Sequence, residues 1–422
     1  MAANPKPRVV ILGGGFGGLY AAKSLAGKPV EVTLVDRRNF HLFQPLLYQV
    51  ATGTLSPGDI AFPLRSVLKK ARNIRVLLGE VVGIDLTEKC VLLQEGSRLA
   101  YDYLIVALGS THSYFNHPEW ETHAPPLKSM ENALEMRSRI FSAFESAELE
   151  PDPEMRKAWL TFTIVGGGST GVELAGTLAE IAKETLREDF RSFDPGSSRI
   201  IVVEAESRIL PSYPEKLSRA AENAIRDLGI EVRTKCLVTE ITSDQVLLQS
   251  NGATEVVPCR TTLWGAGVGG SPLGAAITNG NHEELDHGRV IVGNDLSIAS
   301  HPEVFVVGDL SSHPSNLPGV AQVAIQGGQH AARTILNESS GKPRRPFVYR
   351  DKGNLSVIGR NSAVAQIGRF QFSGFLAWFI WAIVHIAYLI GFKNKFLVMF
   401  QWAWNYWFFN RSARLITTSR EP

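Results

Sequence analysis

The chain has 422 residues, of which 44% are hydrophobic and 20% are charged, and its formal net charge is +2. This composition excludes a disordered chain, and the length is enough to bury two or three hydrophobic cores. The near-neutral total conceals an uneven distribution. Residues 342–422 contain twelve lysine and arginine residues against only Asp351 and Glu421, so the remainder carries about −8. We therefore expect a folded multi-domain protein with a basic C-terminal part.

Aromatic residues are concentrated in the same basic part. Five of the eight tryptophans lie there, beside a dense run of phenylalanine and tyrosine. Positive charge next to aromatic side chains is typical of proteins that bind an anionic membrane surface. We expect a lipid bilayer as a partner, and no nucleic acid.

The three cysteines, Cys90, Cys236 and Cys259, are far apart and form no Cys-x-x-Cys pair. This spacing indicates neither a disulfide framework nor a zinc site, and no metal site is predicted. A reducing compartment fits best. The N-terminus enters a strand within a few residues, which leaves no room for a cleavable signal sequence, so we expect the body of the protein in the cytoplasm.

The first predicted motif is a strand at residues 8–12, a glycine-rich turn at residues 13–18 and a helix at residues 19–25. A second strand at residues 30–35 ends on Asp36. A pyrophosphate needs backbone N–H groups and a helix N-terminus, and the glycines of G-x-G-x-x-G remove the Cβ atoms that would block its approach. Asp36 is placed to accept hydrogen bonds from the ribose hydroxyls. The sequence therefore predicts a dinucleotide site here.

The same order of elements returns later in the chain. A strand at residues 160–165 is followed by the glycine-rich turn 166–171, a helix at residues 172–183 and a strand at residues 199–203 that ends on Glu204. A carboxylate at that position favours a free ribose 2′-hydroxyl and repels a 2′-phosphate, which favours NADH over NADPH. The nearby Arg208 leaves residual use of NADPH open.

Two further strands lie outside these motifs. Residues 103–108 form a strand that runs into a tight turn, and a late strand at residues 304–307 ends on Gly308-Asp309. Two G-x-G-x-x-G turns about 150 residues apart with a late Gly-Asp resemble the two-dinucleotide-binding flavoproteins, relatives of glutathione reductase. That resemblance implies FAD at the first turn and NADH at the second. Without it, Asp309 reads as an acid that caps a turn.

A predicted helix carries two glutamines of chemical interest. Pro318-Gly319 precedes Ala321-Gln322-Val323-Ala324-Ile325-Gln326, so a helix begins there with Gln322 and Gln326 on one face. Taken alone, they read as two solvated side chains. With the preceding Gly-Asp, the segment resembles the quinone-site motif of type II NADH:quinone oxidoreductases. The segments 39–51, 349–353 and 391–395 resemble the same family.

The resemblance implies a set of site residues. For FAD these are Gly13, Gly15, Phe16, Gly17, Gly18, Asp36, Arg37, Gln44, Val82, Ala107, Gly109, Gly308, Asp309, Ala321 and Gln322. For NADH they are Gly166, Gly168, Thr170, Gly171, Glu173, Glu204 and Gly267. The catalytic set is Glu173, Gln322, Gln326 and Lys352, with Glu173, Gln326 and Lys352 in a polar path to the quinone. Taken alone, Glu173 reads as an acid favoured in a first helical turn, and Lys352 as a surface lysine.

The expected fold is α/β, with two Rossmann-like dinucleotide-binding domains and a C-terminal helical membrane-anchoring region. The FAD domain is discontinuous, at residues 1–115 and 266–340, because the NADH domain at residues 116–265 is inserted into it. Residues 341–422 are expected to anchor the protein and to support a homodimer. The expected activity is transfer of hydride from NADH to FAD, and then of two electrons to a membrane quinone without proton pumping.

Two other classes of function stay open. One is a sulfide:quinone or soluble-acceptor reductase, which the lack of a cysteine pair disfavours. The other is a flavin-binding redox sensor that uses NADH only to change shape, against which the glutamine helix and the aromatic tail argue.

The membrane end also admits alternatives. Residues 372–392 carry no formal charge and are long enough to cross a bilayer as one helix. The spacing of Trp378, Trp381 and His385, and the lysines that follow, favour a helix lying in the interface. A buried aromatic core or dimer helix is the third alternative. We expect a monotopic protein on the cytoplasmic face of the cell membrane.

Overall fold

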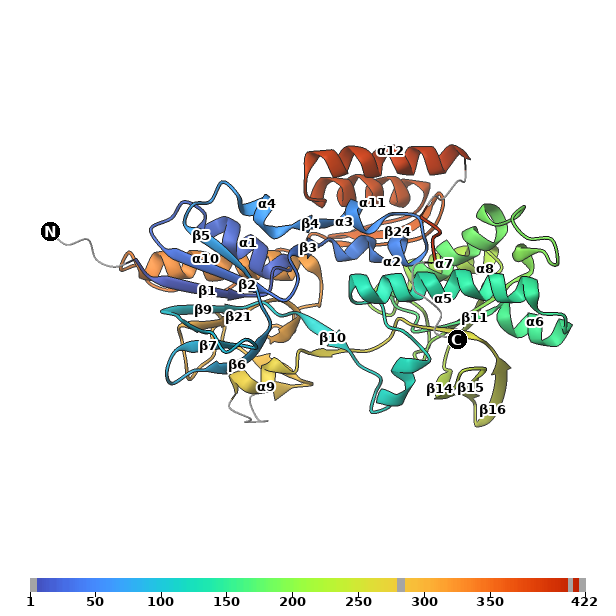
Figure 1. The fold of residues 1–422 in the computed structure, drawn as a ribbon, viewed down its shortest axis with the longest axis horizontal. Coiled ribbons are helices and arrows are strands. Elements are labelled where there is room, and N and C mark those ends of the chain that lie inside the picture. The colour runs from blue at the N-terminus through green and yellow to red at the C-terminus, as the bar shows by residue number, and fades with distance from the viewer. Residues whose placement is uncertain (1–5, 279–284, 409–412, 417–422) are drawn as a thin grey trace. The chain divides into compact units, whose positions relative to one another are not determined.

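The computed structural model describes residues 6–278, 285–408 and 413–416 (Figure 1). Contacts divide the chain into two compact units, each built from segments that are far apart in the sequence. Unit 1 comprises residues 1–42, 61–111 and 268–351, and unit 2 comprises residues 43–60, 112–267 and 352–422. The assignment of domains to FAD and NADH stays a prediction.

The centre of unit 1 is a five-stranded parallel sheet in the order β21-β9-β1-β2-β5. Its strands are β1 (Arg8–Leu12), β2 (Glu31–Asp36), β5 (Ile74–Leu78), β9 (Tyr103–Val106) and β21 (Val304–Val306). Four of the five residues of β1 are buried, as expected for a central strand covered on both faces. Because the strands are parallel, their carboxyl ends meet at one edge of the sheet.

Two helices of unit 1, α1 (Phe16–Leu25) and α10 (Ala321–Glu338), pack closely against each other. A Cβ atom at Gly328 would lie 2.1 Å from the carbonyl oxygen of Gly17, so only glycine permits this approach. The predicted helix after Pro318-Gly319 is confirmed. The first helix begins at Phe16, earlier than predicted.

Smaller elements complete unit 1. An antiparallel sheet contains β6 (Val81–Asp85), β7 (Cys90–Leu93) and β8 (Arg98–Ala100), and β3 (Phe40–Leu42) pairs with β4 (Ala61–Pro63). The remaining elements are α4 (Leu64–Leu68), β18 (Val268–Gly270), α9 (Leu273–Ile277), β19 (Leu285–Asp286), β20 (Arg289–Ile291) and β22 (Ser311–Ser312). In the sequence, β10 (Ser110–His112) spans the junction with unit 2.

Unit 2 contains a second parallel sheet, in the order β13-β12-β11-β17. Its strands are β11 (Thr161–Val165), β12 (Arg199–Val203), β13 (Glu231–Arg233) and β17 (Thr261–Trp264). Helices α5 (Met130–Leu149), α6 (Pro153–Trp159), α7 (Ser169–Glu180) and α8 (Glu215–Asp227) accompany it, with the antiparallel strands β14 (Leu237–Ile241), β15 (Gln245–Ser250) and β16 (Ala253–Pro258). The second strand-turn-helix-strand motif is thereby confirmed.

The C-terminal part of unit 2 is an antiparallel sheet followed by two helices. The sheet contains β23 (Asn354–Gly359), β24 (Ser362–Ile367) and β25 (Phe370–Gly374), and α11 (Phe375–Tyr388) packs on it ahead of α12 (Phe392–Phe408). Two short helices earlier in the chain, α2 (Leu47–Ala51) and α3 (Pro57–Ile60), also belong to this unit.

The prediction of one continuous helix over residues 372–392 is wrong. Residues 372–374 belong to β25, and Gly374 has a φ of 69°, which ends the strand and starts α11. Helix α11 has 14 residues, or about 21 Å at the usual rise, against about 30 Å for a hydrocarbon core. Within the described ranges, no helix combines the length and the apolar character needed to cross a membrane.

Candidate functional site

The first glycine-rich turn joins β1 to α1 in a strained, tightly packed conformation. Gly13 has a φ of 95°, and a Cβ atom there would lie 2.4 Å from the carbonyl oxygen of Ala107. A Cβ atom at Gly18 would lie 1.8 Å from the carbonyl oxygen of Gly13. Gly15, by contrast, faces open space at the N-cap of α1, and no side chain caps that helix. The turn thus leaves helix N–H groups accessible to an anion.

Asp36 lies at the end of β2, next to this turn. Its carboxylate accepts the N–H of Gly14 at 2.5 Å and the N–H of Arg38 at 2.7 Å. Burial raises the pKa of Asp36, while these two hydrogen bonds and the neighbouring arginines oppose the rise. The predicted ribose ligand therefore also fixes the turn. Phe16 and Gly17 follow in the first turn of α1, and Arg37 is exposed.

Four other predicted FAD residues of unit 1 follow two strands of the same sheet. Ala107 and Gly109 follow β9, and Gly308 and Asp309 follow β21. Asp309 accepts the hydroxyl of Ser110 at 2.9 Å. Since β1, β2, β9 and β21 are parallel neighbours, the structure brings these residues to one edge. Val82 lies on β6 and is 54% exposed, and Gln44 belongs to unit 2.

Helix α10 begins with Ala321 and carries both predicted quinone-site glutamines. Gln322 is half-buried in the first turn. One turn later, the Gln326 amide nitrogen donates to the Arg350 carbonyl at 2.9 Å, and its oxygen accepts the Arg350 N–H at 3.0 Å. Gln326 thus holds the backbone of the segment that leads to Lys352. Lys352 itself is exposed and belongs to unit 2.

The second glycine-rich turn repeats the geometry of the first. Gly166 has a φ of 105°, and a Cβ atom at Gly171 would lie 1.8 Å from the carbonyl oxygen of Gly166. Gly168 faces open space at the N-cap of α7. Thr170 follows in the first turn of that helix. The turn can accept a second pyrophosphate in the same manner.

Glu204 takes the position that Asp36 takes in unit 1. Its carboxylate accepts the N–H of Gly167 at 2.7 Å and the N–H of Glu206 at 2.9 Å. Arg208 donates from one terminal nitrogen to the carbonyl oxygens of Pro211 at 3.0 Å and Tyr213 at 3.3 Å. These two hydrogen bonds restrain the guanidinium group of Arg208, the residue that leaves the use of NADPH open in the sequence analysis.

Gly267 follows β17 at the same edge of this sheet. It has a φ of 62°, and a Cβ atom there would lie 2.4 Å from the carbonyl oxygen of Ser113. The parallel arrangement of β11, β12 and β17 places the glycine-rich turn, Glu204 and Gly267 at one edge.

Glu173 is an acid of unit 2 whose pKa is raised. It lies on α7, and burial raises its pKa to about 8, against two hydrogen bonds from Val357 and Ser356. The Ser356 hydroxyl donates to its carboxyl at 3.4 Å. A carboxyl with a pKa near neutrality can take up and release a proton under physiological conditions.

The comparisons with known proteins agree with this geometry. A family profile described as pyridine nucleotide-disulphide oxidoreductase matches residues 7–328, and one described as the NDH2 C-terminal domain matches residues 352–412. The chain is 47% identical over 403 residues to type II NADH:quinone oxidoreductase Ndh of Mycobacterium tuberculosis, covering 94% of this chain and 87% of the relative. The chain belongs to the type II NADH:quinone oxidoreductases.

Further relatives of this type II NADH:quinone oxidoreductase are consistent with the assignment. NdhA of Mycobacterium tuberculosis is 44% identical over 411 residues, covering 95% of this chain and 87% of the relative. The structure of NDH2 from Plasmodium falciparum in complex with NADH has a TM-score of 0.88 at 20% identity, and covers 98% of this chain and 100% of that chain. The similarity to the NDH2 structure from Plasmodium falciparum establishes the fold. As a member of the family, the chain is an oxidoreductase that uses FAD, NADH and quinone.

His41, which lies on β3 of this oxidoreductase, is not among the site residues predicted from the sequence. It is fully buried, its Nδ1 lies 2.9 Å from the Gly14 carbonyl oxygen, and burial lowers its pKa to about 4. The neutral ring therefore donates from Nδ1. Its Nε2 is buried without a hydrogen-bond partner among the described residues. Such an acceptor beside the glycine-rich turn fits a hydroxyl group of a bound dinucleotide. The sequence feature that could have pointed to His41 is a histidine between the apolar residues of β3.

All three cysteines of the oxidoreductase are free and buried. Burial raises the pKa of Cys236 and of Cys259, which keeps both as thiols at neutral pH. Within the part of the chain that the structure describes, no three His, Cys, Asp or Glu side chains gather to hold a metal ion. The thiol chemistry of disulfide reductases has no support here.

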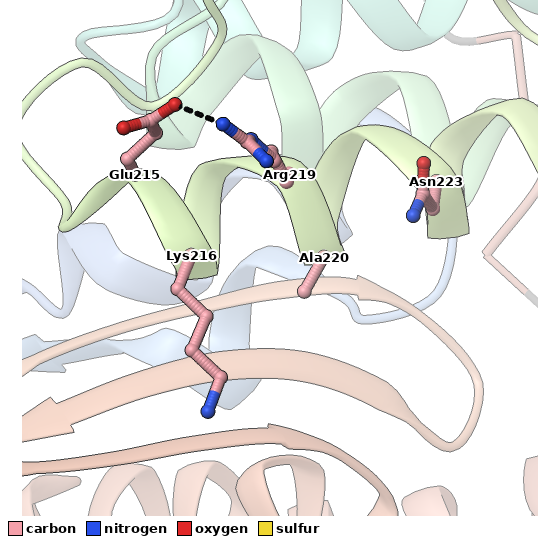
Figure 2. A pocket seen from close by; sticks show the side chains of 5 residues that line it. All are labelled: Glu215, Lys216, Arg219, Ala220 and Asn223. Atoms are coloured by element: carbon pink, nitrogen blue, oxygen red, sulfur yellow. Dashed lines mark hydrogen bonds and ion pairs between the residues drawn. The ribbon is translucent and has the colours of Figure 1, made fainter.

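A surface hollow lies beside α8, and none of the predicted site residues lines it. It is lined by Glu215, Lys216, Arg219, Ala220 and Asn223 (Figure 2). Arg219 is ion-paired with Glu215, and the Lys216 side chain extends toward the neighbouring strands in Figure 2. No predicted cofactor or substrate residue contributes to the hollow, so it has no assigned role.

Proposed function

We propose that the protein oxidises NADH at the second glycine-rich turn and reduces a membrane quinone near the start of α10, without pumping protons. When bound, FAD accepts hydride from NADH and passes two electrons to the quinone. The observation that carries the proposal is the duplicated turn. Each unit presents an open helix N-terminus and a carboxylate bonded to the second glycine of its turn.

The residues of the chain have separate tasks in this proposal. Asp36 and Glu204 hold the two turns and accept ribose hydroxyls. Glu173 contacts nicotinamide or relays a proton, and Gln322 contacts the quinone headgroup. Gln326 and Lys352 complete the polar path to the quinone, with Gln326 acting through the Arg350 backbone. In this proposal Asp309, which accepts the hydroxyl of Ser110, also hydrogen-bonds the ribitol or phosphate part of FAD.

The proposed membrane-binding surface is the outer face of α11 and α12. Large apolar side chains there are between 47% and 73% exposed. They are Phe375, Leu376, Phe379 and Ile383 on α11, and Phe396, Met399, Phe400, Trp404 and Trp407 on α12. An exposed apolar patch of this extent is unusual on a soluble surface and fits burial at a bilayer interface.

The two helices are also anchored to the rest of unit 2. Trp402 donates to the Gln49 side chain at 2.9 Å and its ring lies 5.0 Å from that of Trp381. Asn394 donates to the Gly58 carbonyl at 2.7 Å. These contacts cover the inner face of the two helices. In the proposal the outer face contacts the membrane, by monotopic attachment on the cytoplasmic side. A homodimer is proposed on the family resemblance alone.

One experiment tests the activity. The chain is purified in detergent, its flavin absorbance is recorded, and oxidation of NADH and NADPH is followed with and without a short-chain quinone. We expect quinone-dependent oxidation that strongly prefers NADH. Absence of quinone dependence would refute the proposal. Protease treatment of sealed vesicles, with cleavage from one side only, tests monotopic attachment, and light scattering in detergent tests the dimer.

A further inference from the structure

Helix α7 lies along the edge strand β23 of the C-terminal sheet. Three residues of the helix face the strand at the spacing i, i+3 and i+7, namely Glu173, Gly176 and Glu180. This spacing forms one stripe on an α-helix. Since β23 pairs only with β24 in its sheet, its other edge is available to the helix.

The middle and end of the stripe fix the two elements closely. A Cβ atom at Gly176 would lie 1.5 Å from the carbonyl oxygen of Ile358, so the helix approaches as near as a glycine permits. One turn on, the Glu180 carboxylate accepts the backbone N–H of Arg360. These contacts leave little freedom for the strand to slide along the helix.

The beginning of the stripe is Glu173. Its carboxyl receives the Ser356 hydroxyl at 3.4 Å and a backbone hydrogen bond from Val357. Ser356 is fully buried and comes from the segment that matches the NDH2 C-terminal domain. Two donors from adjacent residues restrict the rotamer of the carboxyl and stabilise its charged form.

We propose that Ser356 is a positioning residue for Glu173, through which the C-terminal sheet sets the orientation and protonation of an acid carried by the second dinucleotide-binding fold. This inference rests on the proposed function, which gives Glu173 its contact with nicotinamide or its part in proton relay. Ser356 contacts neither substrate in this account and acts only through the carboxyl.

The surroundings of Glu173 determine how strongly the Ser356 hydroxyl affects the charge of the carboxyl. β23 carries no charged residue. Other elements that contact α7 carry charged residues, namely Lys183 and Glu184 in the segment that continues the helix, Arg199 on β12, and Glu215, Lys216, Arg219, Glu222, Arg226 and Asp227 on α8. The pKa of Glu173 is shifted by burial and by the hydrogen bonds from Val357 and Ser356, and by none of these charges. Two tyrosines are also nearby, Tyr48 on α2 and Tyr213 ahead of α8. Burial raises the pKa of Tyr213 well above its ordinary value, with a smaller contribution from the charge of Glu173. The phenol of Tyr213 is therefore neutral near pH 8, and hydrogen-bond donors are the main compensation for a charged Glu173.

The test compares Ser356→Ala with the parent protein in detergent, with FAD bound. Loss of the hydroxyl should move the Glu173-dependent limb of the pH–rate profile to higher pH by about half a unit, since one hydrogen bond stabilises the carboxylate. At pH 7 the rate of a half-reaction that requires the Glu173 carboxylate should fall about threefold, because a smaller fraction of Glu173 is then ionised. Each half-reaction is followed separately, by flavin absorbance after mixing with NADH and then with a short-chain quinone.

Two variants make the result specific. Ser218→Ala removes another buried hydroxyl of unit 2, one that donates to the Leu210 carbonyl at 3.0 Å, and should leave the profile unchanged. Glu173→Gln should abolish the limb. A Ser356→Ala profile that coincides with that of the parent overturns the inference, even when Glu173→Gln shows the limb to be real. If the parent protein lacks quinone-dependent activity, it is the proposed function that fails. Flavin content and thermal unfolding establish that each variant is folded.

Discussion

The Glu204 carboxylate accepts the backbone N–H of Gly167 at 2.7 Å, at the point where the second glycine-rich turn approaches its helix. The same relationship joins Asp36 to Gly14 in unit 1. Each acid holds its turn and still has lone pairs, which in the proposed function accept ribose hydroxyls. In the same proposal Glu204 also places negative charge near the position of the 2′-phosphate of NADPH.

Glu204→Gln should relax the preference for NADH. The amide oxygen can still accept from Gly167, while the repulsive charge is gone, so the NADPH-to-NADH ratio of kcat/KM should rise about tenfold. Steady-state kinetics with both nucleotides measure this ratio. Glu206→Gln, two residues on, is the matched control and should leave the ratio as it is. An unchanged ratio in Glu204→Gln would place nucleotide selection elsewhere.

Gln326→Ala should slow quinone reduction about tenfold and spare flavin reduction by NADH. The substitution removes both hydrogen bonds to the Arg350 backbone, so the segment leading to Lys352 loses its restraint. Stopped-flow measurements of the two half-reactions separate the effects. Gln329→Ala, on the same helix, serves as the control. Equal loss of both half-reactions would contradict a role on the quinone side.

Glu173→Gln should change how stability depends on pH. Because burial raises the folded-state pKa of Glu173 to about 8, from 4.5, the folded state binds more protons than the unfolded state between these values. Stability of the parent protein then falls as pH rises from about 4.5 to 8, by at most about 5 kcal/mol from this group. The glutamine variant lacks this loss. Its unfolding temperature relative to the parent should therefore be higher at pH 9 than at pH 6, and a constant difference would contradict the raised pKa.

Gly176→Ala should separate α7 from β23. The new methyl group would collide with the Ile358 carbonyl, and overpacking of this kind costs about 1–3 kcal/mol or more. We expect a lower unfolding temperature and faster proteolysis of the C-terminal segment. Gly168→Ala, where the Cβ position is open, is the comparison for stability. A neutral effect of Gly176→Ala would mean that the two elements can move apart freely.

Replacing Phe375 and Phe379 by serine should weaken binding to anionic vesicles by about tenfold or more, since each exposes apolar area that the proposed membrane contact would bury. Co-sedimentation with liposomes measures the binding. Leu149→Ser, at a residue of α5 that is 79% exposed, removes apolar surface elsewhere and should have no effect. Vesicle binding unaltered by the double substitution would argue against this face as the membrane contact.

Sequence patterns alone identify the two nucleotide-binding motifs and the family. Local constraints suffice there, because the glycine spacing, the apolar strands and the acids Asp36 and Glu204 all act within about forty residues of chain. Pro318-Gly319 and the spacing of the glutamines also predict where α10 begins.

Other features depend on how distant segments of the chain pack together. Residues 372–374 pair with β24 as part of β25, and no local pattern reveals a strand partner, so a helix was considered across them. Gln326 contacts a backbone 24 residues away, and Glu173 meets Ser356 183 residues on. Such pairs, together with the burial that raises the pKa of Glu173, exist only once distant segments pack, because desolvation and long-range hydrogen bonds depend on neighbours in space.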